Sequence, residues 1–305
     1  MSSWRVSQAP FASRRSPTSR MRRGSGGAII GALARVRGER GQGGLETHIL
    51  FFVAAVAAGL INSLAGGGGL ITFPLLALVV PPVVADATSA LALLPAYPSA
   101  VWRTRSKLRE VPRLWLLLIP SALGGLVGAL ILVWTGDRNL LFLVPWLVLG
   151  GTVLFVLEPW LSRRNAGGQE NRGLATALWP LAVAVVFAVA LYGGYFGAGI
   201  GILMISALSL LRMGDVHRVV PLKNLLAGSL RGVAVVVLVI YGEIHWGYGV
   251  PMAVGGLIGG YLGGALTGRV NRTALRVLVM TIGFGLAGHY FLTLYGPSGL
   301  HFGGE

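Results

Sequence analysis

The sequence predicts an all-α, polytopic membrane protein with about eight membrane elements in two four-element repeats. The composition is the first observation: 54% of residues are hydrophobic, 11% are charged, and the mean hydropathy is +0.73. In soluble domains about a quarter of all residues are charged. This composition therefore excludes a soluble globular enzyme. The second observation is that stretches 49–85 and 173–211 contain no charged residue. The third is a glycine-rich motif that occurs twice.

The apolar runs predict the membrane elements in order along the chain. We expect them near residues 49–80, 84–103, 113–135, 139–160, 174–211, 216–241, 245–268 and 273–295. Most are close to the ~20 residues that a helix needs to cross hydrocarbon. The first and the fifth are too long for one crossing of about 30 Å at about 1.5 Å per residue. Each is therefore expected to break or turn back on itself.

Glycine clusters at 66–69 and 193–201 predict where these two elements break. One constant offset places Gly67 on Gly199 and Gly69 on Gly201, and the same motif order continues through both halves. Interrupted helices at matching positions of two repeats are typical of secondary transporters, where they line the substrate path. The alternative is that glycines only allow close helix packing. We favour that alternative for the glycines at 124–128 and 255–263.

The predicted organisation is a basic disordered tail at 1–47, repeats at 48–165 and 174–295, and a short tail at 296–305. The first segment holds nine arginines against Glu39 and Glu46, and a true start at Met21 is the alternative to a tail. Arginines in short loops are a topology signal, so we expect no nucleic-acid partner. If both glycine-rich runs are hairpins, the basic loops share one face and the repeats are inverted. Treating each run as one crossing is the alternative.

Two cations in the sixth element are the strongest functional signal. Lys223 and Arg231 lie inside an apolar run, where a cation costs at least about 2.5–3.5 kcal/mol, so such residues usually face a cavity or a partner. That element has no carboxylate to neutralise both, which points to an anion. The alternative is that Lys223 reaches the loop and Arg231 bonds helix carbonyls. Asp86 is interpreted as a helix N-cap.

The candidate site combines backbone groups at the breaks with these cations and nearby polar side chains. Free N–H groups at a helix start carry partial positive charge and can bind an oxyanion. The predicted substrate-binding residues are Asn62, Gly67, Gly68, Gly69, Thr88, Ser89, Gly197, Gly199, Gly201, Lys223, Asn224 and Arg231. We expect no catalytic residue, no metal site and no cofactor, because the histidines are scattered and cysteine is absent.

These residues carry a family resemblance. The run at 62–76, followed by Asp86, Thr88 and Ser89, resembles the first repeat of the sulfite exporter TauE/SafE family, and 197–201 with 219–224 is similar to its second half. The resemblance implies a multi-pass transporter of the cytoplasmic membrane that exports sulfite, sulfoacetate or related anions using an ion gradient. The sparser second glycine motif and Pro221 depart from the family pattern.

The expected function is secondary transport that exports a small sulfur-containing oxyanion by alternating access between the two repeats. A passive anion channel and a non-catalytic membrane subunit of a larger complex are the alternatives. The expected partners are the small anionic substrate and the lipid bilayer, and a homodimer is one assembly that this interpretation allows.

Overall fold

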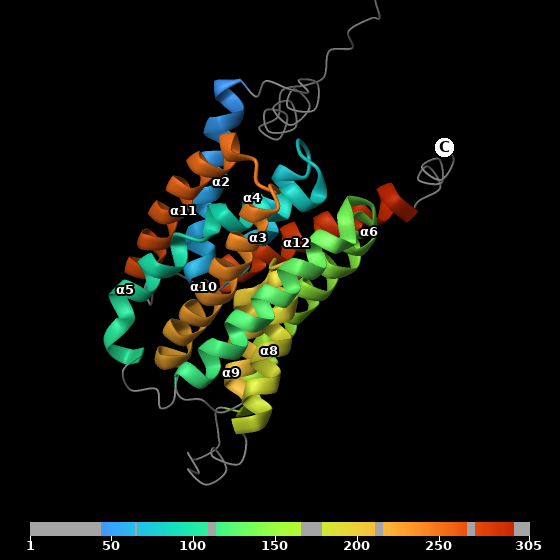
Figure 1. Ribbon diagram of the computed structural model, residues 1–305. Helices are drawn as coiled ribbons and strands as arrows, with labels where there is room; N and C mark the ends of the chain where they lie inside the picture. The colour runs from blue at the N-terminus through green and yellow to red at the C-terminus, as the bar shows by residue number, and fades with distance from the viewer. Residues whose placement is uncertain are drawn as a thin grey trace, which may run out of the picture.

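The computed structural model describes residues 44–64, 66–108, 114–165, 179–210, 216–266 and 272–295. Within these ranges the secondary structure is helical and contains no strand. Figure 1 shows the helices packed side by side as one bundle. The predicted all-α membrane fold is therefore confirmed.

The helices follow the predicted order along the chain. Their bounds are α2 Leu45–Leu64, α3 Gly69–Leu76, α4 Pro82–Leu93, α5 Ala96–Leu108, α6 Trp115–Asn165, α8 Trp179–Tyr195, α9 Ile200–Leu210, α10 Val216–Ile240, α11 Trp246–Leu266 and α12 Arg272–Tyr295. The predicted element at 84–103 is divided into α4 and α5 just before Pro95, which cannot donate a backbone hydrogen bond. Pro221 lies inside α10 without ending it.

A single non-helical residue divides α6 into the two membrane elements expected there. Gly136 has φ 70° and ψ 167°, and the helix resumes directly after it. The neighbouring Asp137 accepts a hydrogen bond of 2.8 Å at Oδ1 from the backbone N–H of Val83, near the start of α4. The bend of α6 therefore lies beside the start of α4.

Both glycine-rich runs are broken, as their length predicts. Between α2 and α3, Gly66 and Gly67 have φ values of 79° and 102°; between α8 and α9, Gly197 and Gly199 have φ values of 63° and 78°. L-residues with a Cβ rarely adopt these angles, so glycine permits both breaks.

Each break turns the chain back toward the side from which it came. The start of α2 lies beside the start of α11, because the rings of His48 and Tyr248 are 5.2 Å apart. The loop before α11 reaches α4, since the N–H of His245 bonds Thr88 Oγ1 at 3.0 Å. The starts of α2 and α4 therefore share one end of the bundle, and α2 with α3 forms a hairpin.

The second hairpin enters from the opposite end. Trp179, at the start of α8, packs against an apolar cluster that includes Leu108 at the end of α5 and Leu117 near the start of α6. In Figure 1, α2 begins at the top of the view and α8 at the bottom. The two hairpins therefore enter the bundle from opposite ends. The arginine-rich loops named in the sequence analysis fall largely outside the described residues.

Glycines let helices of one half pack tightly against helices of the other. Gly124 of α6 fits against Phe187, Ala190 and Leu191 of α8, and Gly255 of α11 fits in the same manner against α2. The second set consists of Phe52, Ala55 and Val56, which lie at a constant offset from the first three. Figure 1 shows α2 with α11 at the upper left and α6 with α8 at the lower right. The same packing therefore occurs twice, and each time it joins the two halves.

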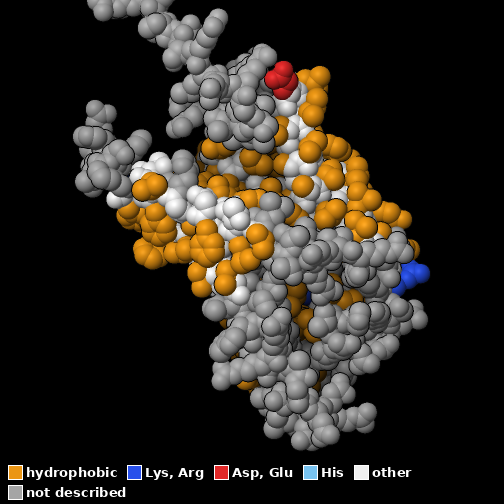
Figure 2. Space-filling view, turned by 180° about the vertical axis from the view of Figure 1, so that it is seen from behind, with side chains coloured by type: hydrophobic (Ala, Val, Ile, Leu, Met, Phe, Trp, Pro, Cys, Tyr) orange, Lys and Arg blue, Asp and Glu red, His pale blue; other side chains and the backbone are white. Residues whose placement is uncertain are grey.

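The outer surface is suited to lipid. In the described part of the chain, four helical stretches are long and apolar enough to cross a membrane: Leu45–Leu64, Trp115–Val153, Val219–Ile240 and Trp246–Leu266. Many large apolar side chains point outward, including Trp134, Ile240 and Leu292. Figure 2 shows hydrophobic side chains over much of the described surface on one face, interspersed with uncharged atoms, and charged groups at its margins. The protein is thus a multi-pass membrane protein.

Candidate functional site

The two glycine breaks meet inside the bundle. A Cβ atom on Gly66 would lie 2.6 Å from the Cα of Gly201, and a Cβ on Gly201 would lie 2.6 Å from the Cα of Gly66. Gly69 faces Ala198 in a similar way, because a Cβ atom on Gly69 would lie 3.1 Å from the Cα of Ala198. Backbone can approach backbone this closely only where side chains are absent. The structure therefore brings the two glycine clusters together at one crossing point, to which Gly69 and Gly201 of the predicted residues contribute.

Lys223 lies beside this crossing and is fully buried. Its side-chain Cδ would be 3.4 Å from a Cβ on Gly201. The ammonium Nζ donates a hydrogen bond of 2.9 Å to the backbone carbonyl of Asn62, near the end of α2. A lysine ammonium has three donors. No carboxylate among the described residues forms an ion pair with Lys223, so its charge is not neutralised there.

Arg231 is bound to the other break. Its Nη2 donates to the carbonyl of Phe196 at 2.9 Å, at the end of α8. A methyl group on Gly197 would overlap the guanidinium, so the absence of a side chain at position 197 creates the space that Arg231 fills. The carbonyl end of a helix carries partial negative charge. Both cations of α10 therefore stabilise helix ends at the breaks, Lys223 at α2 and Arg231 at α8.

Asp86 neutralises Arg231, which corrects the interpretation of Asp86 as an N-cap. The N-cap of α4 is Pro81, and Asp86 lies inside the helix. Its Oδ2 is 3.3 Å from Nη1 of Arg231, and both side chains are almost completely buried. The counter-charge of Arg231 is therefore the carboxylate of Asp86, from the other half of the chain.

The cluster keeps a net positive charge. Within the described residues, Asp86, Lys223 and Arg231 are the buried charged side chains. Counting the two basic groups as cations and Asp86 as a carboxylate leaves one positive charge without a partner. A net charge at membrane depth is costly unless a ligand or water compensates it.

Unpartnered polar groups surround this charge. The side-chain Nδ2 of Asn62 and Oδ1 of Asn224 are buried and have no hydrogen-bond partner among the described residues. The backbone N–H groups of Gly199 and Gly201 likewise find no acceptor in that part of the chain. Buried polar groups are normally satisfied. Four of the predicted residues therefore have polar groups without a partner, and two of them, Asn62 and Gly201, contact Lys223.

Two tyrosines outside the set of predicted substrate-binding residues also belong to this region. Tyr97 of α5 is buried and faces both Asn62 and Arg231. Tyr192 of α8 donates a hydrogen bond of 3.1 Å from its hydroxyl to the carbonyl of Ala198, inside the second break. Proximity of Tyr192 to the second glycine cluster was the available signal, whereas nothing in the sequence links Tyr97 to Arg231.

Thr88 and Ser89 are engaged elsewhere. The Thr88 hydroxyl accepts the hydrogen bond from His245, and Ser89 Oγ lies 2.6 Å from Thr72 Oγ1 of α3. Both side chains are buried. The hydroxyls of Thr88 and Ser89 therefore already have partners, whereas Asn62 Nδ2 and Asn224 Oδ1 have none among the described residues.

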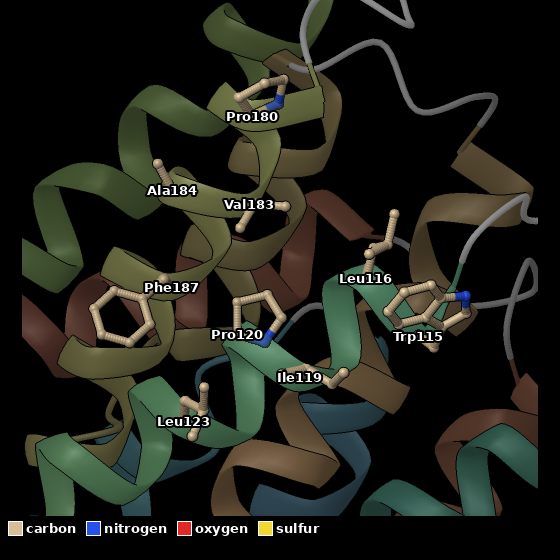
Figure 3. Close-up of a pocket in the computed structure, with 9 residues that line it drawn as sticks. All are labelled: Trp115, Leu116, Ile119, Pro120, Leu123, Pro180, Val183, Ala184 and Phe187. Carbon is tan, nitrogen blue, oxygen red and sulfur yellow. The ribbon is translucent and has the colours of Figure 1, made fainter.

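An apolar hollow of about 530 Å³ lies away from the cluster, on the outside between α6 and α8. Figure 3 shows Trp115, Pro120 and Phe187 among its lining side chains. It has no charged lining group, and none of the predicted substrate-binding residues contributes to it. The hollow therefore lacks the chemistry that an anion requires.

Comparison with known proteins identifies the family. A protein from Haemophilus influenzae described as a probable membrane transporter is 24% identical over 79% of this chain and 93% of its own length. The probable membrane transporter ORF9 from a Sinorhizobium species is 30% identical over 69% of this chain and 80% of its own length. The probable membrane transporter YfcA of Escherichia coli K12 is 27% identical to this chain, over 83% of this chain and 92% of its own length.

No solved structure is significantly similar to this chain. The family described as sulfite exporter TauE/SafE matches residues 51–290, which span every described helix break and both buried cations. Its curated relatives are membrane transporters by description. The chain is accordingly a membrane transporter that belongs to the sulfite exporter TauE/SafE family.

Proposed function

We propose that this protein is a secondary transporter that exports a small sulfur-containing oxyanion across the cytoplasmic membrane by alternating access. The observation that carries the proposal is Lys223, a fully buried ammonium whose observed partner is an uncharged carbonyl. An anion that contacts Lys223 removes the unbalanced charge of the cluster. The family description supports sulfite and related sulfur oxyanions as the substrate class.

The polar groups around Lys223 suit an oxyanion. The N–H groups of Gly199 and Gly201 and the amide Nδ2 of Asn62 are donors, and oxyanion oxygens are acceptors. The substrate site that we propose is therefore the crossing of the two breaks, with Lys223 as the principal cation.

The arrangement of the hairpins supports alternating access. Two hairpins inserted from opposite ends meet at the crossing, so a small tilt of one hairpin against the other would open the crossing to one side at a time. Arg231 and Lys223 bind the two hairpins to the same helix, α10. Helix α10 is thus the element against which both hairpins would move.

The test is transport by the purified full-length protein in oriented proteoliposomes with imposed ion gradients and membrane potential. Labelled sulfite, sulfate and sulfoacetate are offered separately, with labelled chloride as a non-sulfur control. We expect saturable flux of at least one sulfur oxyanion that responds to a gradient. Flux that does not saturate and ignores every imposed ion gradient would indicate a passive channel, and no flux of any of these anions would contradict the proposal.

A further inference from the structure

The buried ion pair between Asp86 and Arg231 has a feature that a purely structural ion pair does not need. Arg231 holds the break of the second hairpin through the carbonyl of Phe196, while its other edge faces a carboxylate from α4. A guanidinium binds carboxylates and other oxyanions through the same planar set of N–H donors. The carboxylate of Asp86 therefore occupies a position that a substrate oxyanion could take.

The charge of the cluster decides what must accompany the substrate. Lys223, Arg231 and Asp86 together carry one positive charge. A monovalent anion at the crossing brings the sum to zero, whereas a divalent anion leaves one excess negative charge. An uncompensated buried charge is expensive in a membrane interior, so the divalent anion needs one more positive charge.

We propose that Asp86 is a proton-binding site whose occupancy is linked to the charge of the transported anion. When a divalent oxyanion contacts Arg231, the Asp86 carboxylate leaves the guanidinium and takes one proton. The only bond formed is the O–H bond of the carboxylic acid, and the ion pair with Arg231 is exchanged for the ion pair with the anion. This inference rests on the proposed function and adds the coupled ion to it.

The surroundings leave Asp86 as the group best placed to take this proton. Arg231 of α10 is bonded to it, the charge of Asp86 reaches the Tyr192 hydroxyl of α8, and the charge of Arg231 reaches the Tyr97 hydroxyl of α5. The other titratable groups described on helices packed against α4 are Asp137 and Arg138 of α6, Tyr248 and Tyr261 of α11, Lys223 of α10, and Glu46 and His48 in the first turn of α2. His245, in the loop before α11, contacts α4 through its backbone N–H, which bonds Thr88. Helix α3 contains no ionisable side chain.

The linkage also fixes the charge that crosses the membrane. A divalent anion with one proton and a monovalent anion without a proton each carry one net negative charge. A membrane potential that is negative inside then drives both outward. Export of either kind of anion would be electrogenic, and only export of the divalent anion would move a proton.

The experiment measures protons and anions together with the full-length protein in proteoliposomes that contain a pH-sensitive dye. Labelled sulfate serves as the divalent anion and labelled methanesulfonate as the monovalent one. We expect about one proton per sulfate and about none per methanesulfonate, because only sulfate leaves an excess charge. In Asp86→Asn the ratio for sulfate should fall to about none, while the matched carboxylate variant Glu243→Gln should keep the wild-type ratio.

Equal proton ratios for the two anions in the wild-type protein would overturn the inference, as would an unchanged ratio for sulfate in Asp86→Asn. If Asp86→Asn is not recovered in folded form, the comparison of sulfate with methanesulfonate in the wild-type protein decides alone. Transport of both anions with equal ratios contradicts only the proton-binding role of Asp86. The absence of transport for every sulfur oxyanion contradicts the proposed function and this inference with it.

Discussion

The ammonium of Lys223 binds the backbone carbonyl of Asn62, which lies 161 positions earlier in the chain, at 2.9 Å. This contact joins the second half of the protein to the end of α2 in the first half. A lysine that snorkelled to the loop would lie at the surface, but Lys223 has no exposed area. Its charge is therefore held at the crossing of the two glycine breaks.

Replacement of Lys223 tests its proposed role as the principal cation. Lys223→Gln keeps a polar side chain that can donate a hydrogen bond but removes the charge. We expect anion flux to fall by about tenfold or more, because a hydrogen bond to a charged group contributes about 1.5–3 kcal/mol. The measurement is the initial rate of labelled anion flux at equal protein density. Arg105→Gln is the control, because Arg105 is exposed and stacks on Trp102 at 4.3 Å. Equal losses in both variants would argue against a specific role.

Alanine at Gly197 should displace Arg231. The added methyl group would overlap the guanidinium, and the φ of 63° is unfavourable for alanine. Gly199→Ala is the matched control, because its φ of 78° imposes similar backbone strain while its nearest contact is 3.8 Å away. We expect Gly199→Ala to cost about 1–3 kcal/mol of stability and Gly197→Ala to cost clearly more.

A double-mutant cycle separates the two causes in Gly197→Ala. If the guanidinium is what the methyl group displaces, combining Gly197→Ala with Arg231→Gln should cost less than the sum of the single variants. Thermal unfolding in detergent, followed by loss of monodisperse protein, measures each free-energy change. Additive costs would show that the overlap with Arg231 is unimportant.

The contact between Gly66 and Gly201 should be intolerant of any side chain. In Gly201→Ala the new methyl group would push against the backbone of Gly66, and we expect a loss of about 1–3 kcal/mol, as for other overpacked sites. Gly285→Ala in α12 is the control, because nothing lies within 4 Å of its would-be Cβ. Helix propensity alone should make that change neutral or stabilising. A Gly201→Ala protein as stable as Gly285→Ala would contradict the close crossing.

Glu243, in the loop before α11, should make stability depend on pH. Partial burial raises the pKa of its carboxyl, and the charge of Asp137 raises it further. The carboxyl of Glu243 thus binds a proton more tightly in the folded protein than in the unfolded chain, in which the pKa of glutamate is about 4.3. The stabilisation is complete below that pH and is lost as the pH rises through the higher folded value. The midpoint of thermal unfolding of Glu243→Gln, compared with wild type across this range, should show a smaller decline with pH.

The helices and their breaks could be predicted because membrane thickness limits each element. Runs 49–80 and 174–211 exceed one crossing, and glycine is concentrated where they break. Pro95 lies where α4 and α5 are divided, whereas Pro221 lies inside α10 without ending it.

The pairing within the site could not be predicted from the sequence. Asp86 resembled an N-cap because it precedes Thr88 and Ser89, yet α4 begins upstream at Pro82, and Asp86 thereby turns into the bundle. Its partner Arg231 lies 145 positions away. Local patterns show that a cation is buried but not what neutralises it, since that depends on how the two halves pack. Whether the twelve predicted residues bind substrate stays a prediction.

The exchange of packing partners between the halves has a consequence for biogenesis. Helix α2 finds its glycine-lined neighbour, α11, only after roughly two hundred further residues have been synthesised, and α6 must likewise wait for α8. Neither half can consolidate alone on leaving the ribosome. Separately expressed fragments divided between α6 and α8 should be degraded individually and rescue each other when they are produced in the same cell.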